Sequence, residues 1–369
     1  MRKIFAIIRL VLLFTLGVYA QQSEIVVDKS ASDTKEKKSG EASKVPAQVK
    51  ISGFTQFSYT SDPTLGGIEP FAVKTARVGF SWKFNDWAEF KIQPDFYGFA
   101  TSTSITTVTN ISNKAVSVIA AVPTVNFKEL WAEFIADKDL LRVKVGQYLV
   151  PFSFENNYPA SKAKVFDTPQ FLSKTIIAKY DYGIQLCGNL PGDNMKNLLS
   201  WRVGILNGTT YGSETDGMKD FSGYFVTKPI NDFEFGISAY TRHIAACNKY
   251  ETHYGFYGKY ETEGTLPLFT TFEYIAGKDT SGVKDIMDFV FTVEAKPFVM
   301  FLPSLSCLAP VFRFERWDEN IWDGSYVSYY TVGLNIYADK SVRFLADYVI
   351  KSDTIPDNNK FNTMVQINY

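Results

Sequence analysis

The sequence predicts an all-β fold: a 16-stranded antiparallel transmembrane β-barrel with short periplasmic turns and long extracellular loops. Three observations lead to this prediction. Apolar and polar residues alternate with a period of two from residue 49 onward, an export signal precedes that region, and the connections between strands alternate between short and long.

The composition allows a large ordered β-structure and disfavours several other classes. The chain has 369 residues, with 38 Lys and Arg against 39 Asp and Glu, so its net charge of -1 gives no reason to expect a nucleic-acid partner. Aromatic residues reach 16% and charged residues stay at 21%, which excludes a disordered chain. Three Cys and two His leave little material for a disulfide framework or a zinc site, so we expect no cofactor and no metal.

Residues 1–20 have the pattern of a signal peptide. Arg2 and Lys3 supply the positive charge, residues 10–18 form a short apolar core, and a cleavage site follows. That core is shorter than the about 20 apolar residues that a membrane-spanning helix needs, so a permanent anchor is the weaker alternative. Residues 21–48 contain no aromatic residue and mix charges with Ser and Gly, which predicts a flexible periplasmic tether. The barrel is expected over 49–369.

Each predicted strand has one apolar and one polar face. In 286–297, for example, apolar residues such as Met287 and Phe289 alternate with polar residues such as Asp288 and Glu294. Helical periodicity does not fit these segments. The strands are predicted at 49–59, 71–83, 87–97, 124–135, 140–149, 180–190, 198–208, 220–228, 232–243, 252–262, 266–278, 286–297, 304–316, 326–338, 341–351 and 361–369.

The connections are sorted by length. Those after even-numbered strands, such as 84–86 and 229–231, are short and rich in turn-forming residues, whereas those after odd-numbered strands, such as 98–123 and 150–179, are long. A transmembrane barrel shows this sorting, and a soluble β-sandwich has no reason to show it. The barrel must close because unpaired N–H and C=O groups at a sheet edge cost several kcal/mol each in hydrocarbon. A barrel of this size leaves an aqueous channel.

The last predicted strand resembles an assembly signal. Phe361, Thr363, Val365, Ile367 and Tyr369 share one face, and the printed sequence ends on that aromatic residue. The pattern resembles the C-terminal signal that the barrel-assembly machinery of Gram-negative bacteria reads. Together with the export signal, it predicts insertion among the outer-membrane lipids of a Gram-negative cell.

Three segments resemble one porin family. In the same order along the chain, they are similar to strand motifs of the phosphate-selective porin O and P family: 141–155 (LRVKVGQYLVPFSFE), 182–188 (YGIQLCG) and 202–209 (RVGILNGT). The resemblance covers about 49–369 and implies a homotrimeric porin whose third long loop, here 150–179, constricts the channel. From the residues themselves, Gly146 and Gly204 indicate close backbone packing, and Pro151 ends a strand because it lacks an N–H group.

The charges that line the lumen decide which solutes pass. In the third long loop, four Lys (162, 164, 174 and 179) oppose Glu155 and Asp167, which gives a local charge of +2. Glu129 and Glu133 lie on the strand paired with that of Arg142 and Lys144, so most inward charges are expected to form ion pairs. The candidate pore-lining and constriction residues are Lys162, Lys164, Lys174, Arg77, Arg142, Lys144, Arg202, Arg242, Arg313, Glu129 and Glu133.

These observations predict a porin for the passive diffusion of small hydrophilic solutes, with a mild preference for anions such as phosphate. A barrel enzyme would need a nucleophile beside a base, and the two histidines, His243 and His253, are expected at loops or rims, so we expect no enzyme. A surface adhesin would need an elaborated outer loop, and 98–123 is long enough to provide one.

Aromatic residues gather at the predicted strand ends, as in the interfacial girdles of membrane barrels. Platforms that bind sugars are the alternative for any one of them. The residues concerned are Trp82, Trp87, Phe99, Trp201, Trp317 and Trp322. The sequence leaves open whether Cys187, Cys247 and Cys307 form a pair.

Overall fold

The computed structural model describes residues 48–63, 71–99, 103–109, 115–121, 125–137, 140–175, 179–192, 195–208, 217–244, 248–264, 266–353 and 358–369. The predicted signal peptide, Cys247 and the predicted tether except for Gln48 lie outside the described residues. Within the described ranges, no helix has both the length and the apolar character needed to cross a membrane.

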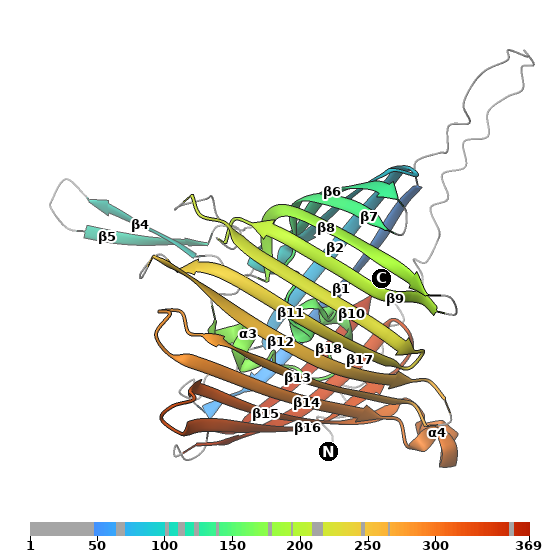
Figure 1. The fold of residues 1–369 in the computed structure, drawn as a ribbon. Coiled ribbons are helices and arrows are strands. Elements are labelled where there is room, and N and C mark those ends of the chain that lie inside the picture. The colour runs from blue at the N-terminus through green and yellow to red at the C-terminus, as the bar shows by residue number, and fades with distance from the viewer. Residues whose placement is uncertain are drawn as a thin grey trace, which may run out of the picture. The chain divides into compact units, whose positions relative to one another are not determined.

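Sixteen strands form one closed antiparallel barrel (Figure 1). They are β1 (Gln48–Ser61), β2 (Phe71–Asn85), β3 (Ala88–Asp95), β6 (Asn126–Asp137), β7 (Leu141–Leu149), β8 (Tyr180–Gly192), β9 (Met195–Leu206), β10 (Asp220–Ile230), β11 (Phe233–Ile244), β12 (Lys249–Thr262), β13 (Leu268–Lys278), β14 (Asp285–Ala295), β15 (Leu308–Asn320), β16 (Ser325–Tyr337), β17 (Val342–Ser352) and β18 (Lys360–Asn368). β1 closes the barrel against β18, with Phe54 opposite Asn368 and Ser61 opposite Phe361. The predicted strand number and closure are confirmed.

The strand boundaries agree with the prediction to within four residues at every end. Pro310 does not interrupt β15, where it lies opposite Leu334 of β16. One prediction is wrong: the segment 98–123 is not only a loop. It contains β4 (Thr103–Thr109) and β5 (Ala115–Ala121), which pair with each other in a separate two-stranded sheet. Their Thr and Val residues favour strands, and they pair locally instead of joining the barrel.

The two faces of the barrel wall differ in chemistry. Along β14, residues from Ile286 to Glu294 alternate between buried positions, including Asp288, and partly exposed apolar positions. Apolar side chains of the outer face are well exposed, for example Ile237 at 62% and Val332 at 55%. Because Arg or Lys facing lipid at the membrane midplane would cost about 2–4 kcal/mol, most charged residues of the wall point inward. The protein is therefore a transmembrane barrel of the outer-membrane type.

The sorting of connections by length holds with two kinds of exception. The connections 245–248 and 321–324, which were expected to be long, are short because β12 and β15 extend further than predicted. The connection 296–307, which was expected to be short, contains α4 (Phe298–Phe301) and the 3-10 helix η5 (Pro303–Leu305). Alternation of length therefore identifies the two ends of the barrel but does not give the size of every loop.

The third long loop, 150–179, folds into the barrel. It contains α2 (Phe154–Asn157), the 3-10 helix η4 (Ala160–Lys162) and α3 (Gln170–Lys174). Phe152 and Phe171 of this loop are fully buried and pack in one cluster with inward side chains of the wall, including Tyr240 and Ile275. The apolar residues at these inward positions of the strands thus serve to bind the loop, not the lipid.

Two predictions about single residues are wrong. Trp317 was expected in an interfacial girdle, but it is 3% exposed and meets the edge of Phe171 at a centroid distance of 6.5 Å. His253 was expected at a rim, but it is fully buried, with its Nε2 2.7 Å from the carbonyl oxygen of Lys278. Both occupy inward positions that the loop covers. Trp87 and Trp322, in contrast, are exposed at strand ends, as girdle residues would be.

Candidate functional site

Wall carboxylates hold the third long loop by accepting hydrogen bonds from its backbone. Glu273 of β13 accepts the N–H groups of Phe154 and Glu155 at 2.5 and 3.0 Å and the Ser153 hydroxyl at 3.1 Å. Three further contacts of the same kind follow along the loop: Phe166 N to Asp347 at 2.7 Å, Gln170 N to Glu315, and Phe171 N to Asp288 at 2.9 Å. These acceptors lie on β13, β14, β15 and β17, so the loop is attached across a wide part of the wall.

Wall donors bind the carbonyl groups of the same loop. Arg343 donates to Ala163 O at 2.7 Å, and Arg313 donates to Asp167 O at 2.8 Å. Gln366 donates to Ser161 O at 2.7 Å, and Asn335 donates to Lys164 O at 2.8 Å. The backbone N–H and C=O groups of a loop inside the barrel need hydrogen-bond partners. These inward side chains supply the partners that a helix or a sheet would otherwise provide.

Most charges of the loop are neutralised by the wall. Lys164 lies 2.8 Å from Glu294 and Lys174 lies 2.6 Å from Glu319. Glu155 pairs with Arg313 at 2.6 Å, and Asp167 pairs with Lys360 at 3.0 Å. The predicted loop charge of +2 is therefore not available as such to a solute.

Two loop lysines have no carboxylate partner in the described part of the chain. Lys162 is exposed, and Lys179 lies just before β8. Burial, together with the nearby charges of Arg77 and Lys128 and against the effect of Glu155, lowers the pKa of Lys179 to about 8. Lys162 is thus the loop cation most available to a solute.

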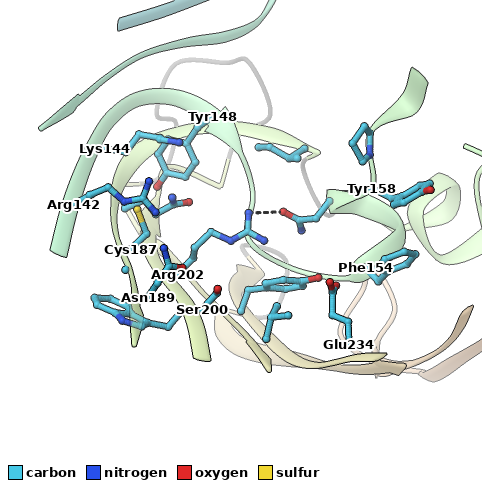
Figure 2. A pocket seen from close by; sticks show the side chains of 18 of the residues that line it. Arg142, Lys144, Tyr148, Phe154, Tyr158, Cys187, Asn189, Ser200, Arg202 and Glu234 are labelled. Atoms are coloured by element: carbon cyan, nitrogen blue, oxygen red, sulfur yellow. Dashed lines mark hydrogen bonds between the residues drawn. The ribbon is translucent and has the colours of Figure 1, made fainter. Parts of the chain in front are cut away.

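An open cavity of about 590 Å³ remains between the loop and the opposite part of the wall. Its lining comes from β6 to β12 and from the loop, and Figure 2 shows the side chains that surround it. Six of the predicted site residues line it: Glu129, Glu133, Arg142, Lys144, Lys162 and Arg202. The other five, Arg77, Lys164, Lys174, Arg242 and Arg313, are not among its lining residues.

Of the two glutamates of β6 that were expected to face cations of β7, Glu133 does so and Glu129 does not. Glu133 lies 3.3 Å from Lys144 and 3.5 Å from Arg142, so one carboxylate serves two cations. Glu129 pairs with Lys91 of β3 at 3.0 Å. These inward charges stiffen the wall, as expected from their positions on neighbouring strands.

Arg202 differs from the other cations of the cavity. Its guanidinium donates to Asn157 Oδ1 of the loop at 2.9 Å and lies 4.5 Å from the ring centroid of Tyr224. Within the described ranges it has no carboxylate partner. The carboxylate of Glu234, on the same cavity, is engaged by Lys228 at 3.1 Å and Lys259 at 3.5 Å. Sequence reasoning missed Asn157, because nothing in its local pattern shows which strand the loop will face.

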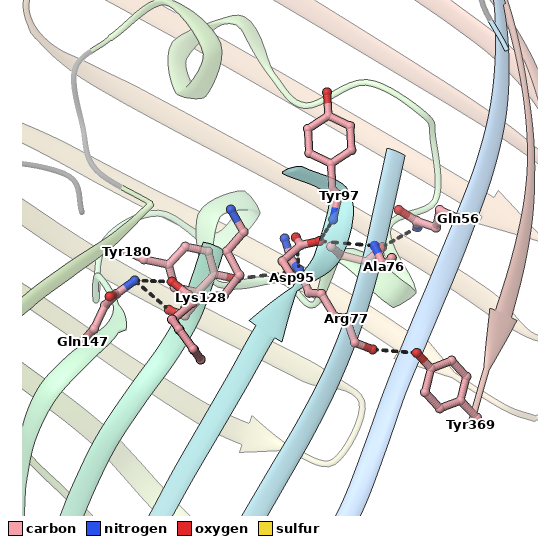
Figure 3. Close-up of polar contacts among 11 residues, drawn as sticks. Gln56, Ala76, Arg77, Asp95, Tyr97, Lys128, Gln147, Tyr180 and Tyr369 are labelled. Atoms are coloured by element: carbon pink, nitrogen blue, oxygen red, sulfur yellow. Dashed lines mark hydrogen bonds and ion pairs between the residues drawn. The ribbon is translucent and has the colours of Figure 1, made fainter. Parts of the chain in front are cut away.

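The remaining predicted arginines brace the wall. Figure 3 shows Arg77 beside Asp95, which lies 2.9 Å away and also accepts the backbone N–H groups of Ala76 and Tyr97 at 3.2 Å each. Arg77 Nη1 also donates to the Tyr180 hydroxyl at 3.2 Å. Arg242 is 5% exposed and donates to Asp279 O at 2.7 Å.

The glycine predictions agree with the packing in β7 and β9. A Cβ on Gly146, whose φ is +123°, would lie 2.3 Å from the carbonyl oxygen of Leu130. A Cβ on Gly204 would lie 3.1 Å from the hydroxyl of Tyr148, which lines the cavity. β7 ends at Leu149, two residues before Pro151. These positions set how closely the wall and the cavity side chains approach each other.

Comparison with known proteins identifies the architecture. No family model and no curated protein matches the sequence. The anion-selective porin from Comamonas acidovorans matches with a TM-score of 0.59 at 12% identity, over 88% of this chain and 100% of that chain. OmpF of Salmonella typhi, solved with daunomycin, matches with a TM-score of 0.60 at 8% identity, over 87% and 97% of the two chains. The fold is that of the outer-membrane porins.

A third solved structure is also similar. The trimer form of OmpT, an outer membrane protein of Vibrio cholerae, matches with a TM-score of 0.54 at 10% identity, over 88% of this chain and 99% of that chain. Identities this low establish the porin fold and nothing finer. Membership of the phosphate-selective porin O and P family stays a prediction.

Proposed function

We propose that the protein is a porin that lets small hydrophilic solutes diffuse passively through its lumen, with a mild preference for anions, and that it is not an enzyme. In this proposal it lies in the outer membrane of a Gram-negative bacterium, assembles as a homotrimer and is inserted by the barrel-assembly machinery through β18. The similar solved structures support the channel, and the trimer form among them supports the homotrimer.

One observation carries the anion preference. The cavity beside the loop is lined by six basic side chains, Arg142, Lys144, Lys162, Arg202, Lys228 and Lys259, and by four acidic ones, Glu129, Glu133, Glu234 and Glu261. The excess is two positive charges, and two of the cations, Lys162 and Arg202, have no carboxylate partner within the described ranges. Cations left unpaired in a narrow aqueous passage attract anions and repel cations.

The experiment is a reversal-potential measurement on purified protein in planar bilayers under a KCl gradient. We expect stepwise conductance and a reversal potential that corresponds to a chloride-to-potassium permeability ratio above one. A ratio below one rejects the anion preference, and the absence of channel conductance from folded protein rejects the porin function. Replacing chloride by phosphate in the same bilayers tests whether the preference extends to phosphate.

The alternative functions receive less support from the site. His253 is buried beneath the loop, and His243 lies at the end of β11 with its Nε2 3.1 Å from Asn248 Oδ1, so neither histidine is placed to activate a nucleophile in the cavity. The β4–β5 hairpin keeps the adhesin hypothesis open as a question for binding assays. The charged cavity favours the channel.

A further inference from the structure

We propose that Asn157 is a positioning residue that holds the Arg202 guanidinium across the lumen and thereby sets the charge selectivity of the channel. The proposal rests on the porin function and assigns a measurable share of its anion preference to one of the two unpaired cations, Arg202, and to the amide that holds it. The hydrogen bond between them joins the loop to β9, and Figure 2 shows it as the dashed line that starts at the guanidinium of Arg202.

The amide group of Asn157 is held from the loop side. Its Nδ2 lies 2.8 Å from Phe152 O, 2.9 Å from Ser153 O and 3.2 Å from Val150 O. With the NH2 group occupied by loop carbonyls, the Oδ1 atom is turned toward the wall, where it accepts a hydrogen bond from Arg202 Nη1 at 2.9 Å. The orientation of the amide is therefore determined by the loop, and the amide in turn determines the position of the guanidinium.

The loop end of this connection is itself fixed to the wall. Ser153 caps α2, since its Oγ accepts the Asn156 N–H at 3.2 Å, and the same hydroxyl donates to Glu273 of β13 at 3.1 Å. A chain of contacts therefore runs from β13 through Ser153 and α2 to Asn157, and from there to Arg202 on β9. This chain of contacts crosses the lumen. The Arg202 side chain is therefore held by β9 at its backbone and by the loop at its guanidinium, and it does not move freely.

The neighbours of Arg202 on the barrel wall leave its positive charge available to a solute. Its cross-strand neighbour on β8 is Cys187, a small thiol, and its neighbour on β10 is Tyr224, whose ring lies against the guanidinium. A neutral amide partner orients a cation without cancelling its charge, whereas Glu133 offsets one of the two positive charges of Arg142 and Lys144. A guanidinium has five N–H donors, and Asn157 takes one of them, so the others remain for a passing anion.

The experiment is a double-mutant cycle on reversal potential with wild type, N157A, R202Q and the double variant. We expect R202Q to lower the chloride-to-potassium permeability ratio about fourfold, because one unit charge at roughly 10 Å in water changes the chloride and potassium permeabilities about twofold each in opposite directions. N157A should lower the ratio by part of that amount, because the guanidinium is then mobile. In the R202Q background, N157A should have no further effect on the ratio.

R202K and R316Q complete the design. R202K keeps the charge but not the forked donors, so it should resemble N157A, and it tests the positioning if N157A fails to fold. Arg316 lies on the outer wall over Tyr326, 3.8 Å from its ring centroid, so R316Q removes an arginine outside the lumen and should leave the ratio unchanged.

The outcomes separate this proposal from the porin function. If N157A lowers the ratio equally with and without Arg202, Asn157 only shapes the loop and the proposal is overturned. The proposal is also overturned if R202Q or R202K keeps the wild-type permeability ratio. The anion preference of the channel then stands without it. A wild type that conducts without preferring chloride overturns both this assignment and the anion preference.

Discussion

At the scale of single residues, the wall depends on positions where only a hydrogen atom fits. Gly146 combines a φ of +123° with a backbone approach in which a Cβ would meet Leu130 O at 2.3 Å and Trp131 Cα at 2.9 Å. Neither atom can move away easily, because both belong to the backbone of β6. A side chain here would separate β6 from β7 beside Glu133, the carboxylate that pairs with Lys144.

We therefore predict that G146A destabilises the barrel by about 1–3 kcal/mol, the range for a residue forced into an unfavourable backbone conformation. The measurement is the temperature at which folded protein converts to the unfolded electrophoretic form. G223A is the matched control on β10, because its Cβ would meet only a side-chain atom of Phe225 at 3.4 Å. Equal melting temperatures for G146A and G223A would contradict the prediction.

Residue patterns also show where sequence reasoning ends. Alternation correctly placed Glu133, Arg142 and Lys144 on one face, because side chains of a strand point alternately to its two sides. It could not show that Trp317 and His253 are covered by the loop, since both stand at inward positions that would otherwise face water. Asn157 has no strand pattern at all, and only the folded loop brings it to Arg202.

At the scale of elements, the third long loop behaves as an inner lining of the barrel. Its backbone donates to carboxylates on four strands, and its buried phenylalanines pack against the wall. Glu273 is the strongest of these attachments because it accepts three hydrogen bonds from consecutive residues, Ser153 to Glu155. Loss of a buried acceptor of this kind costs about 1–3 kcal/mol of stability for each donor that is left without a partner.

We predict that E273Q frees the first part of the loop, because an amide NH2 would face backbone N–H groups that require an acceptor. The expected result is noisier single-channel current with a changed mean conductance, recorded in planar bilayers. E319Q is the matched control: Glu319 contacts the same loop through Lys174, but it is exposed, and such pairs contribute only about 0–1 kcal/mol. If the current noise and mean conductance of E273Q equal those of E319Q and the wild type, Glu273 does not hold the loop.

At the scale of the whole molecule, closure removes the sheet edge that hydrocarbon does not tolerate. The seam runs between β1 and β18, where eight residue pairs from Phe54–Asn368 to Ser61–Phe361 are in register. Tyr369 adds to it, since its backbone exchanges hydrogen bonds with Gly53 at 2.7 and 3.0 Å and its hydroxyl donates to Arg77 O at 2.9 Å.

The seam can be tested by cross-linking. Thr55 lies opposite Ile367 on the two closing strands, and directly opposed residues have Cα atoms about 4.5–5.5 Å apart, within the range of a disulfide. We predict that the double variant T55C/I367C forms a disulfide on mild oxidation, seen as a shift in electrophoretic mobility after denaturation. T55C/V332C is the control, because Val332 belongs to β16, and a disulfide there but not at the seam would refute the register.

The alternation of apolar and polar residues was enough to predict the number of strands, their inward and outward faces and the closed barrel, whereas the loop that enters the barrel was expected only from the resemblance to a porin family. The strands and their closure follow from local chemistry: alternation with period two reports which side of a strand meets lipid, and an open edge is too costly to exist in a membrane. Which charges stay free depends instead on contacts between distant parts of the chain. Ion pairs between the loop and the wall join residues far apart in sequence, so Lys164 is neutralised by Glu294 while Arg202 meets an amide, and no local pattern distinguishes the two.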